Sequence, residues 1–388
     1  MYDQLTVPSI LKRTQRPALI MAAGGVLLAV VGFFLDAAQF WQSYLLAFLF
    51  WLAMGLGCLG FVMLHHLAGG RWSALIRRIM ETGAMTLPIM ALLFLPLLFG
   101  LRTLYPWLNS EHVAASDLLQ QKAAYLNLPF FLVRAVLYFG VWITLAALLN
   151  RWSVAEDNGG QAQVALRMRR LSAIGMLLYA ITATFAAYDW MMSLEPEWFS
   201  SIYGLLFIAG QALAALALAI ISLRYLGRAN ATTEAWTNQF NDLGNFLLGF
   251  VMIWAYFAFS QFLIIWSANI PEEALWYYHR SQGGWLQVGI FLIALHFVLP
   301  FFLLLSRPLK RKAHLLTVLA VLILVARVID LYWLIVPAFH PEGLHLHWLD
   351  FVLLIAMGSG WYLIFARQWV RTAPVAHHDP HLVGVAHE

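Results

Sequence analysis

The sequence is poor in charge and in cysteine. Asp, Glu, Lys and Arg make up 11% of the 388 residues, whereas hydrophobic residues make up 62%. A water-soluble domain carries about 25% charged residues. The composition therefore excludes a soluble globular protein. The single cysteine, Cys58, excludes an internal disulfide and a cysteine-rich cluster site.

Several motifs of enzymes and cofactor-binding proteins are also missing. The chain has no Gly-rich phosphate loop, nucleophile elbow, zinc-binding helix motif or Cys-x-x-Cys-His haem attachment site. A membrane haem needs two facing histidines at matched depth, and only His296 lies deep in an apolar run. We therefore expect no metal site and no redox cofactor on this chain. The net charge of +4 gives no support for nucleic-acid binding.

Long apolar runs dominate what is present. Ten of them could cross a hydrocarbon core of about 30 Å as helices, and they lack the period-two alternation of barrel strands. The sequence therefore predicts an all-α polytopic membrane protein with ten transmembrane helices. The runs cover residues 17–35, 44–64, 84–104, 127–149, 172–188, 202–223, 243–265, 285–305, 315–336 and 349–366.

The basic residues are distributed unevenly between the loops. Most of the 23 Lys and Arg residues fall on the side that holds the N-terminus, while the loops of the other side are acidic and aromatic. By the positive-inside rule, both termini are predicted to be cytoplasmic.

Two pairs of spans resemble each other at their ends. Spans two and six start with Ser43-Tyr44 and Ser201-Ile202-Tyr203, and spans four and eight end with a polar residue followed by Arg. This suggests two four-helix bundles, spans two to five (about 44–188) and six to nine (about 202–336), with spans one and ten peripheral. Residues 1–371 are expected to form a single membrane domain, followed by a His-rich, disordered cytoplasmic tail over 372–388.

The acidic and aromatic composition of two loops on the acidic side needs a physical explanation. Residues 188–201 carry three carboxylates and two tryptophans but no Lys or Arg, and residues 260–278 run from span seven into a second acidic, aromatic loop. An interface belt explains the Trp and Tyr residues but not the acids. The acids either anchor helices at the membrane surface or contact a partner. The candidates for a partner interface are Asp189, Trp190, Glu195, Glu197, Trp198, Glu272 and Glu273.

Polar side chains within the spans are costly and are therefore functional candidates. They are Asp330, Arg327, His296, Arg134, Gln261 and Tyr256. One hypothesis is structural: buried ion pairs fix the helix packing, chiefly Arg327 with Asp330, and Arg134 with an acid of the outer face such as Asp189. The other is a quinone pocket or a proton path, because carboxylate, histidine and tyrosine are common proton acceptors.

Three segments on the acidic side resemble the NrfD-like membrane subunits of the polysulfide-reductase family, most closely those of bacterial alternative complex III. They are residues 189–200, residues 260–273 and Arg327-Val328-Ile329-Asp330. The resemblance implies a ten-helix subunit of a respiratory quinol:cytochrome c (or other acceptor) oxidoreductase in the bacterial cytoplasmic (inner) membrane. It implies a paralogous NrfD-like partner and extracytoplasmic multihaem cytochrome and iron–sulfur subunits, which would hold the haem c and the clusters. Quinone or quinol is the implied ligand.

Two functions follow as hypotheses. In the first, the chain supports quinol oxidation, proton translocation or assembly of the complex, without being catalytic alone. In the second, it is a secondary transporter with a polar site near the membrane midplane at His296. Transporter repeats usually place broken helices at the binding site, whereas most prolines of this chain lie near span ends.

Overall fold

The computed structural model describes residues 9–157, 162–226 and 234–376. These ranges are helical, without strands, and contain ten helical segments that are long and apolar enough to cross a membrane. The all-α, multi-pass architecture predicted from the sequence is thereby confirmed. The ten segments are Leu11–Leu35, Ala37–Ala68, Arg77–Leu104, Leu128–Asp157, Gln163–Leu194, Tyr203–Leu226, Trp236–Ala268, Trp285–Leu305, Ala313–Ala338 and Trp348–Arg371.

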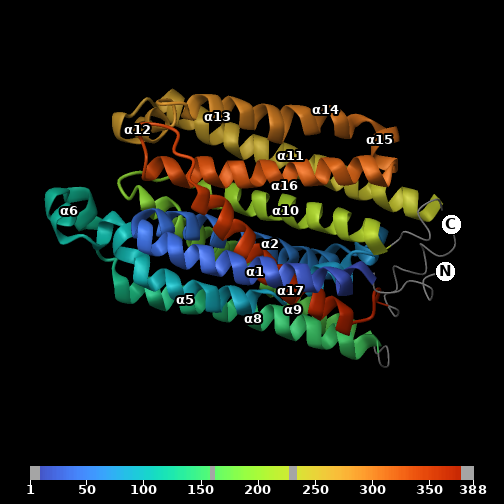
Figure 1. The fold of residues 1–388 in the computed structure, drawn as a ribbon. Helices are drawn as coiled ribbons and strands as arrows, with labels where there is room; N and C mark the ends of the chain where they lie inside the picture. Colours follow the sequence, from blue (N-terminus) through green and yellow to red (C-terminus); the bar gives the residue numbers. More distant parts are fainter. Residues whose placement is uncertain (1–8, 158–161, 227–233, 377–388) are drawn as a thin grey trace.

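The long helices lie side by side along one common direction (Figure 1). Short helices connect them at both ends. In chain order the α-helices are α1 Ser9–Leu35, α2 Ala37–Ala68, α3 Arg71–Ala74, α4 Arg77–Ala84, α5 Leu87–Leu104, α6 Ser110–Ala115, α7 Asp117–Lys122, α8 Leu128–Asp157, α9 Ala162–Trp190, α10 Tyr203–Leu226, α11 Glu234–Ala268, α12 Pro271–His279, α13 Trp285–Leu292, α14 Leu299–Leu305, α15 Arg307–Arg311, α16 Ala313–Ile335 and α17 Trp348–Arg371. A π-helical segment, Ile293–Val298, joins α13 to α14.

Helices α2 and α10 form the centre of the molecule. α2 packs on α4, α5, α9 and α17, and α10 packs on α9, α11 and α16. The two central helices approach each other closely at Gly57, where a Cβ atom would overlap the backbone carbonyl of Gln211. Small residues allow this close packing of membrane helices. The two halves of the chain therefore share a continuous interface, and their division into two four-helix bundles stays a prediction.

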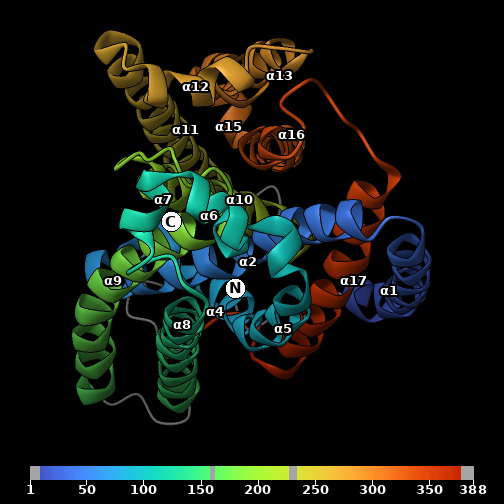
Figure 2. The same cartoon turned by 90° about the vertical axis from the view of Figure 1, so that its left-hand side faces the viewer.

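Helices α1 and α17 lie together at one edge of the molecule (Figure 2). α1 leaves most of its apolar side chains exposed, as expected for a peripheral span in contact with lipid. α17 is more covered, because it lies between α1 and α2. Gly25 and Gly32 bring α1 close to Ala356 and Leu349 of α17.

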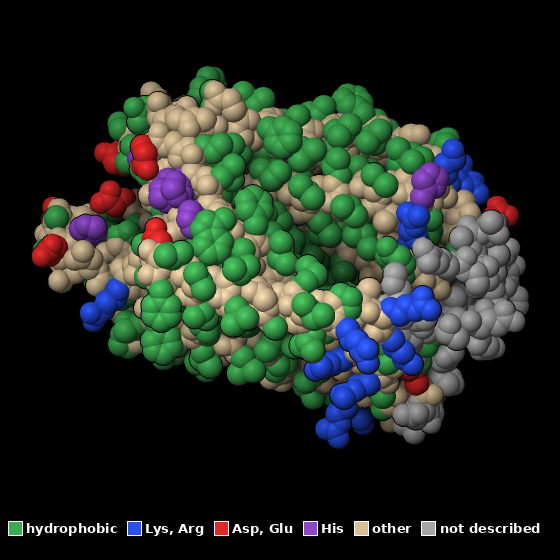
Figure 3. Space-filling model, viewed as in Figure 1, with side chains coloured by type: hydrophobic (Ala, Val, Ile, Leu, Met, Phe, Trp, Pro, Cys, Tyr) green, Lys and Arg blue, Asp and Glu red, His purple; other side chains and the backbone are tan. Residues whose placement is uncertain are grey.

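The two ends of the molecule differ in charge. In Figure 3, Lys and Arg gather at the end where α1 begins and α17 finishes, and Asp and Glu gather at the opposite end. We call these ends the basic face and the acidic face. They match the charge asymmetry of the sequence, while the assignment of the basic face to the cytoplasm stays a prediction.

Several helices extend beyond the apolar runs that predicted them. α8 continues to Asp157 and α9 begins at Ala162, because polar residues at a membrane surface can remain helical without being apolar. At the start of the predicted tail, Val375 and Ala376 are buried, so residues 372–376 do not match a disordered segment. The remainder of that tail, residues 377–388, lies outside the described residues.

Candidate functional site

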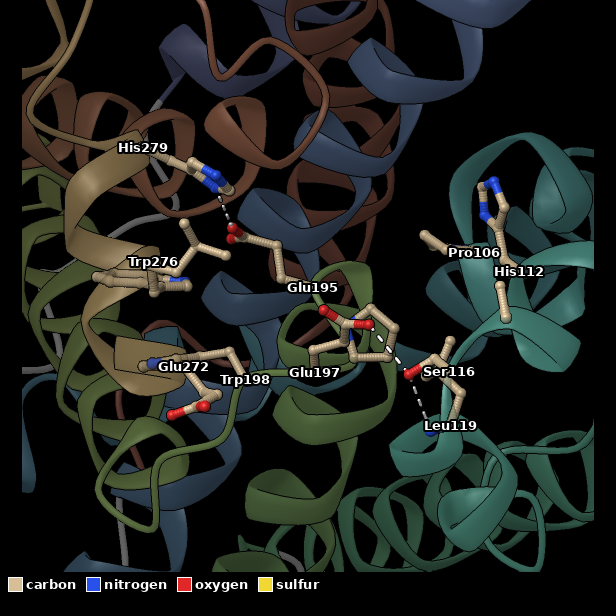
Figure 4. A pocket seen from close by; sticks show the side chains of 13 residues that line it. Pro106, His112, Ser116, Leu119, Glu195, Glu197, Trp198, Glu272, Trp276 and His279 are labelled. Carbon is tan, nitrogen blue, oxygen red and sulfur yellow. Dashed lines mark hydrogen bonds and ion pairs between the residues drawn. The ribbon is translucent and has the colours of Figure 1, made fainter. Parts of the chain in front are cut away.

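A pocket opens on the acidic face between three parts of the chain. It has a volume of about 410 Å³ and lies between the loop after α9, the α6–α7 connection and α12. Its lining includes three carboxylates, two histidines and two tryptophans, whose side chains are drawn in Figure 4. Four predicted interface residues line this pocket together: Glu195, Glu197, Trp198 and Glu272. We call it the acidic pocket.

Glu195 joins the α9–α10 loop to α12. Its carboxylate lies 2.8 Å from Nη2 of Arg280 and 3.2 Å from Nδ1 of His279. Burial alone would raise the pKa of Glu195, but the Arg280 guanidinium and the hydrogen bonds from His279 and Arg280 outweigh it, so the pKa lies below its usual value. Glu195 is therefore an anionic anchor of the pocket wall at neutral pH.

Arg280 lies behind the pocket residue Trp276 and connects it to the end of α16. Its guanidinium lies 3.5 Å from the centroid of the Trp276 ring and donates a 2.8 Å hydrogen bond to the carbonyl oxygen of Leu334. Trp276 also stacks on Trp198, with ring centroids 4.6 Å apart and planes within 14°. No role for Arg280 was predicted from the sequence, because a single arginine between two spans does not reveal which distant carboxylate it contacts.

The outer rim of the pocket is more accessible. Glu197 and Glu272 are exposed, and Glu197 accepts a 3.1 Å hydrogen bond from Ser116. Glu272 and Glu273 occupy the first turn of α12 behind Pro271, where a carboxylate is favoured by the helix dipole. The rim thus presents exposed carboxylates, whereas the charge of Glu195 deeper in the pocket is already paired with Arg280.

Asp189 lies below this loop and is fully buried. Its two carboxylate oxygens each lie 2.8 Å from a guanidinium nitrogen of Arg134, and Tyr138 donates a further 2.8 Å hydrogen bond. The arginine also lies over the rings of Tyr125 and Phe130. The predicted pairing of Arg134 with Asp189 is confirmed.

The interface prediction needs correction at three residues. Asp189, Trp190 and Trp198 are buried within the chain, so their side chains are not available to a partner. The physical reason is that α9 continues to Trp190 rather than ending with the apolar run at residue 188, and Trp276 covers Trp198. For the other four candidates, contact with a partner stays a prediction: these are Glu195, Glu197, Glu272 and Glu273.

A second polar group lies within the membrane-spanning part. Arg327 and Asp330, one turn apart on α16, form the predicted ion pair, and both are almost fully buried. Nε1 of Trp254 donates to Asp330 at 3.3 Å. Gly210 of α10 makes room for the guanidinium, because a Cβ atom there would overlap Arg327.

His296 lies beside this pair in the π-helical segment. Its ring centroid is 4.0 Å from that of Trp254, it is fully buried, and neither ring nitrogen has a hydrogen-bond partner. Single π-helical turns are often found at functional sites. A buried imidazole with two free nitrogens can accept or release a proton, or bind a water molecule.

The remaining predicted span residues do not join this group. Gln261 of α11 is buried and accepts a 3.0 Å hydrogen bond from Ser200, so it connects α11 to the α9–α10 loop at the acidic face. Tyr256 is 66% exposed on the apolar surface of α11. The six polar span residues therefore lie in separate places, because they sit on helix faces that have different neighbours.

A cluster of buried charges near the basic face escaped the sequence analysis. Arg77 and Arg78 of α4 pair with Glu81 one turn further on, and also with Glu156 and Asp157 at the end of α8. Both acids belong to the last turn of α8, and residues 158–161 lie outside the described part. The spacing of Arg77 and Glu81 was the available signal, since it places both side chains on one helix face.

Over the ranges 9–157, 162–226 and 234–376, no group of three or more His, Cys, Asp or Glu residues could hold a metal ion. The histidines of the C-terminal tail fall outside these ranges. In comparisons with known proteins, no protein-family model and no curated protein matches this chain.

Proposed function

We propose that this chain is an integral membrane subunit of a bacterial respiratory quinol:acceptor oxidoreductase, of the kind found in alternative complex III. One observation carries the proposal: two of the three segments with the family resemblance meet at the acidic face, and the third lies about one helical turn below it on α16. Ser200 bonds to Gln261, Trp198 stacks on Trp276, and the Arg280 beside them binds the end of α16, the helix that holds Arg327 and Asp330.

The depth of Asp330 supports a role in proton movement. It lies four residues, about one helical turn or 6 Å, before Leu334, whose carbonyl accepts a hydrogen bond from Arg280, the partner of Glu195. Tyr203, at the start of α10, packs edge-on against Trp198 of the acidic pocket, with ring centroids 5.6 Å apart. In this proposal, protons released near Asp330 and His296 leave past Tyr203 toward the exposed carboxylates of the acidic pocket.

The acidic rim supports a partner on the same face. Glu197 and Glu272 are exposed carboxylates at the mouth of a preformed pocket. Complementary charge would direct the approach of a basic surface on an extracytoplasmic cytochrome or iron–sulfur subunit. This chain would then contribute proton handling or assembly, and its partners would supply the haem c and the clusters.

Site-specific photocrosslinking in native membranes tests the partner contact. A photoreactive residue at Glu197 should crosslink to a haem-c-containing or iron–sulfur subunit, whereas one at Arg170, exposed at the basic face, should not. Equal crosslinking at both positions, or crosslinks from Glu197 only to copies of this chain, would contradict the proposed assembly.

The secondary transporter is the second candidate, and the π-helical segment favours it. Residues 293–298 interrupt the regular helix at the buried His296, and an interrupted helix is a common feature of transporter binding sites. Vesicles that contain only this chain would distinguish the two functions. Solute uptake driven by an ion gradient and abolished by His296→Ala would support transport, and its absence with intact protein favours the respiratory subunit.

A further inference from the structure

Three histidines lie on the loop that joins α16 to α17 at the acidic face. The loop covers residues 339–347 and is the extended connection between these two helices in Figure 2. Its histidines are His340, His345 and His347. None of them lines the acidic pocket, so they form a separate group of titratable side chains on this face.

The three imidazole rings form a stack. The ring centroids of His340 and His345 lie 4.1 Å apart with planes within 17°, and those of His345 and His347 lie 6.1 Å apart with planes within 8°. Neutral rings can stack in this way, whereas two imidazolium ions at the His340–His345 separation repel each other. The stack is therefore an arrangement of neutral histidines.

The loop is fastened to the helices beneath it. Nε2 of His340 donates a 3.0 Å hydrogen bond to the side-chain oxygen of Gln42 on α2. The carbonyl of His340 accepts a 2.9 Å hydrogen bond from Nε1 of Trp285 at the start of α13. The backbone N–H of Leu344 donates to the carbonyl of Gly283 at 2.8 Å. The ring of His340 therefore holds the loop at its contact with α2.

His347 caps α17 with its side chain. Its Nδ1 accepts a 3.3 Å hydrogen bond from the backbone N–H of Leu349, and the Asp350 carboxylate accepts a 3.1 Å bond from the backbone N–H of His347. Nδ1 can accept a hydrogen bond only while it carries no proton. Protonation at this atom would therefore remove a cap from α17.

Few opposite charges offset a proton on the stack. The titratable side chains that face it are Glu342 on the loop, Tyr332 of α16 and Asp350 of α17, while α2 and α13 contribute the neutral Gln42 and Trp285. Glu342 lies 3.5 Å from Nδ1 of His340 but is 74% exposed, so water screens its charge. Burial and the neighbouring His345 outweigh the two acids, and the pKa of His340 lies below its usual value.

We propose that the stack of His340, His345 and His347 is a pH-sensitive latch on the α16–α17 loop. While the three rings are neutral, the latch holds the loop against α2 and caps α17. When the solution at the acidic face becomes mildly acidic, protonation separates the rings and releases the loop. The hydroxyl of Tyr332 on α16, which donates to the carbonyl of His345, is released with it. This inference does not depend on the proposed respiratory function.

Hydrogen–deuterium exchange of the full-length chain in detergent, read by mass spectrometry, tests the latch. Because the pKa of His340 in the folded chain is depressed, loop closure is complete above about pH 6.5 and weakens as the pH falls below it. Peptides that cover residues 340–350 should exchange about tenfold faster at pH 5.5 than at pH 7.5, after correction for the intrinsic pH dependence of exchange. Peptides from α10 should keep the same corrected rate.

A double variant removes the two groups whose protonation opens the latch. His340→Phe keeps an aromatic ring in the stack, and His347→Asn keeps a side chain that caps a helix well. The corrected rates of this variant at the two pH values should agree within about twofold. His314→Phe is the matched control, because His314 is exposed at the start of α16 at the basic face, and it should retain the tenfold change.

Equal corrected rates in the wild-type chain, or a tenfold change that survives in the double variant, would overturn the proposal. If the double variant does not fold, exchange of the imidazole C2 hydrogen in the wild-type chain measures the titration midpoint of His340. A midpoint below about 6.5 supports the latch, and a midpoint at or above this value overturns it.

Discussion

Buried charge in this chain is accommodated by pairing, and Arg134 with Asp189 shows how. The carboxylate receives two guanidinium hydrogen bonds and one from Tyr138, so no charged atom of Asp189 is left without a partner. Both residues could be paired from the sequence, because an arginine inside a span requires a nearby acid at the same depth. The partner of Glu195 could not be predicted from the sequence, since Arg280 becomes its neighbour only through tertiary packing.

Removing one member of the buried pair should be severe. Asp189→Ala leaves the Arg134 guanidinium unpaired, and we expect the free energy of unfolding to fall by about 3–5 kcal/mol. Denaturant titration in detergent measures this loss. Glu342→Ala, at a side chain that is 74% exposed, should change stability by less than about 0.5 kcal/mol. The double variant Arg134→Met/Asp189→Leu should recover most of the loss, and a double variant no better than Asp189→Ala would contradict this view.

Glu195 should make stability depend on acid pH. Because its pKa in the folded chain lies below the ordinary 4.5, its contribution is complete above about pH 4.5 and is lost as the pH falls through the lower folded value. Glu195→Gln should cost about 1–3 kcal/mol at neutral pH. In thermal unfolding between pH 7 and about pH 3, the two proteins should converge toward the acidic end. A difference that stays constant would show that the charge of Glu195 does not stabilise the fold.

Asp330 tests the proposed proton path at the residue scale. Asp330→Asn keeps the shape of the side chain but prevents proton exchange, so quinol-linked proton movement should slow more than the amount of assembled complex falls. Asp350→Asn is the control, since Asp350 is also buried near the acidic face but caps α17 and bonds to Ser43. Equal losses of assembled complex and turnover in Asp330→Asn would assign Asp330 to structure alone.

At the scale of the helices, hydropathy located all ten spans but not their ends. Apolar runs determine which segments cross the membrane, whereas α8 and α9 continue into polar residues that a hydropathy argument does not count. The continuation of α9 moved Asp189 and Trp190 from the expected surface into the interior. The π-helical segment at His296 was also invisible, because it depends on a local change in the hydrogen-bond register rather than on composition.

The contact between α2 and α10 yields a prediction at this scale. Gly57→Ala would force its Cβ atom into the backbone of α10, where no side chain can rotate away, and we expect a loss of about 1–3 kcal/mol. Gly249→Ala is the matched control, because nothing lies within 4 Å of its Cβ position, and it should be neutral or stabilising by up to about 1 kcal/mol. Unfolding of both variants in detergent tests this, and equal stability would argue against a close α2–α10 contact.

At the scale of the whole molecule, charge is separated along the membrane normal. The basic face, the acidic face and the helix number all follow from the sequence, because they reflect loop composition and the length of apolar runs. The acidic pocket does not, since it brings together Ser116, Glu195 and Glu272 from three distant parts of the chain. Its exposed carboxylates leave this end suited to a partner.

Purification of the chain from its native membrane in mild detergent tests the respiratory assignment most directly. We predict that haem c absorption and quinol:acceptor activity will co-purify with it in fixed proportion, and that an NrfD-like subunit will be present in the same complex. A colourless, inactive preparation that contains this chain alone or only copies of itself would contradict the account.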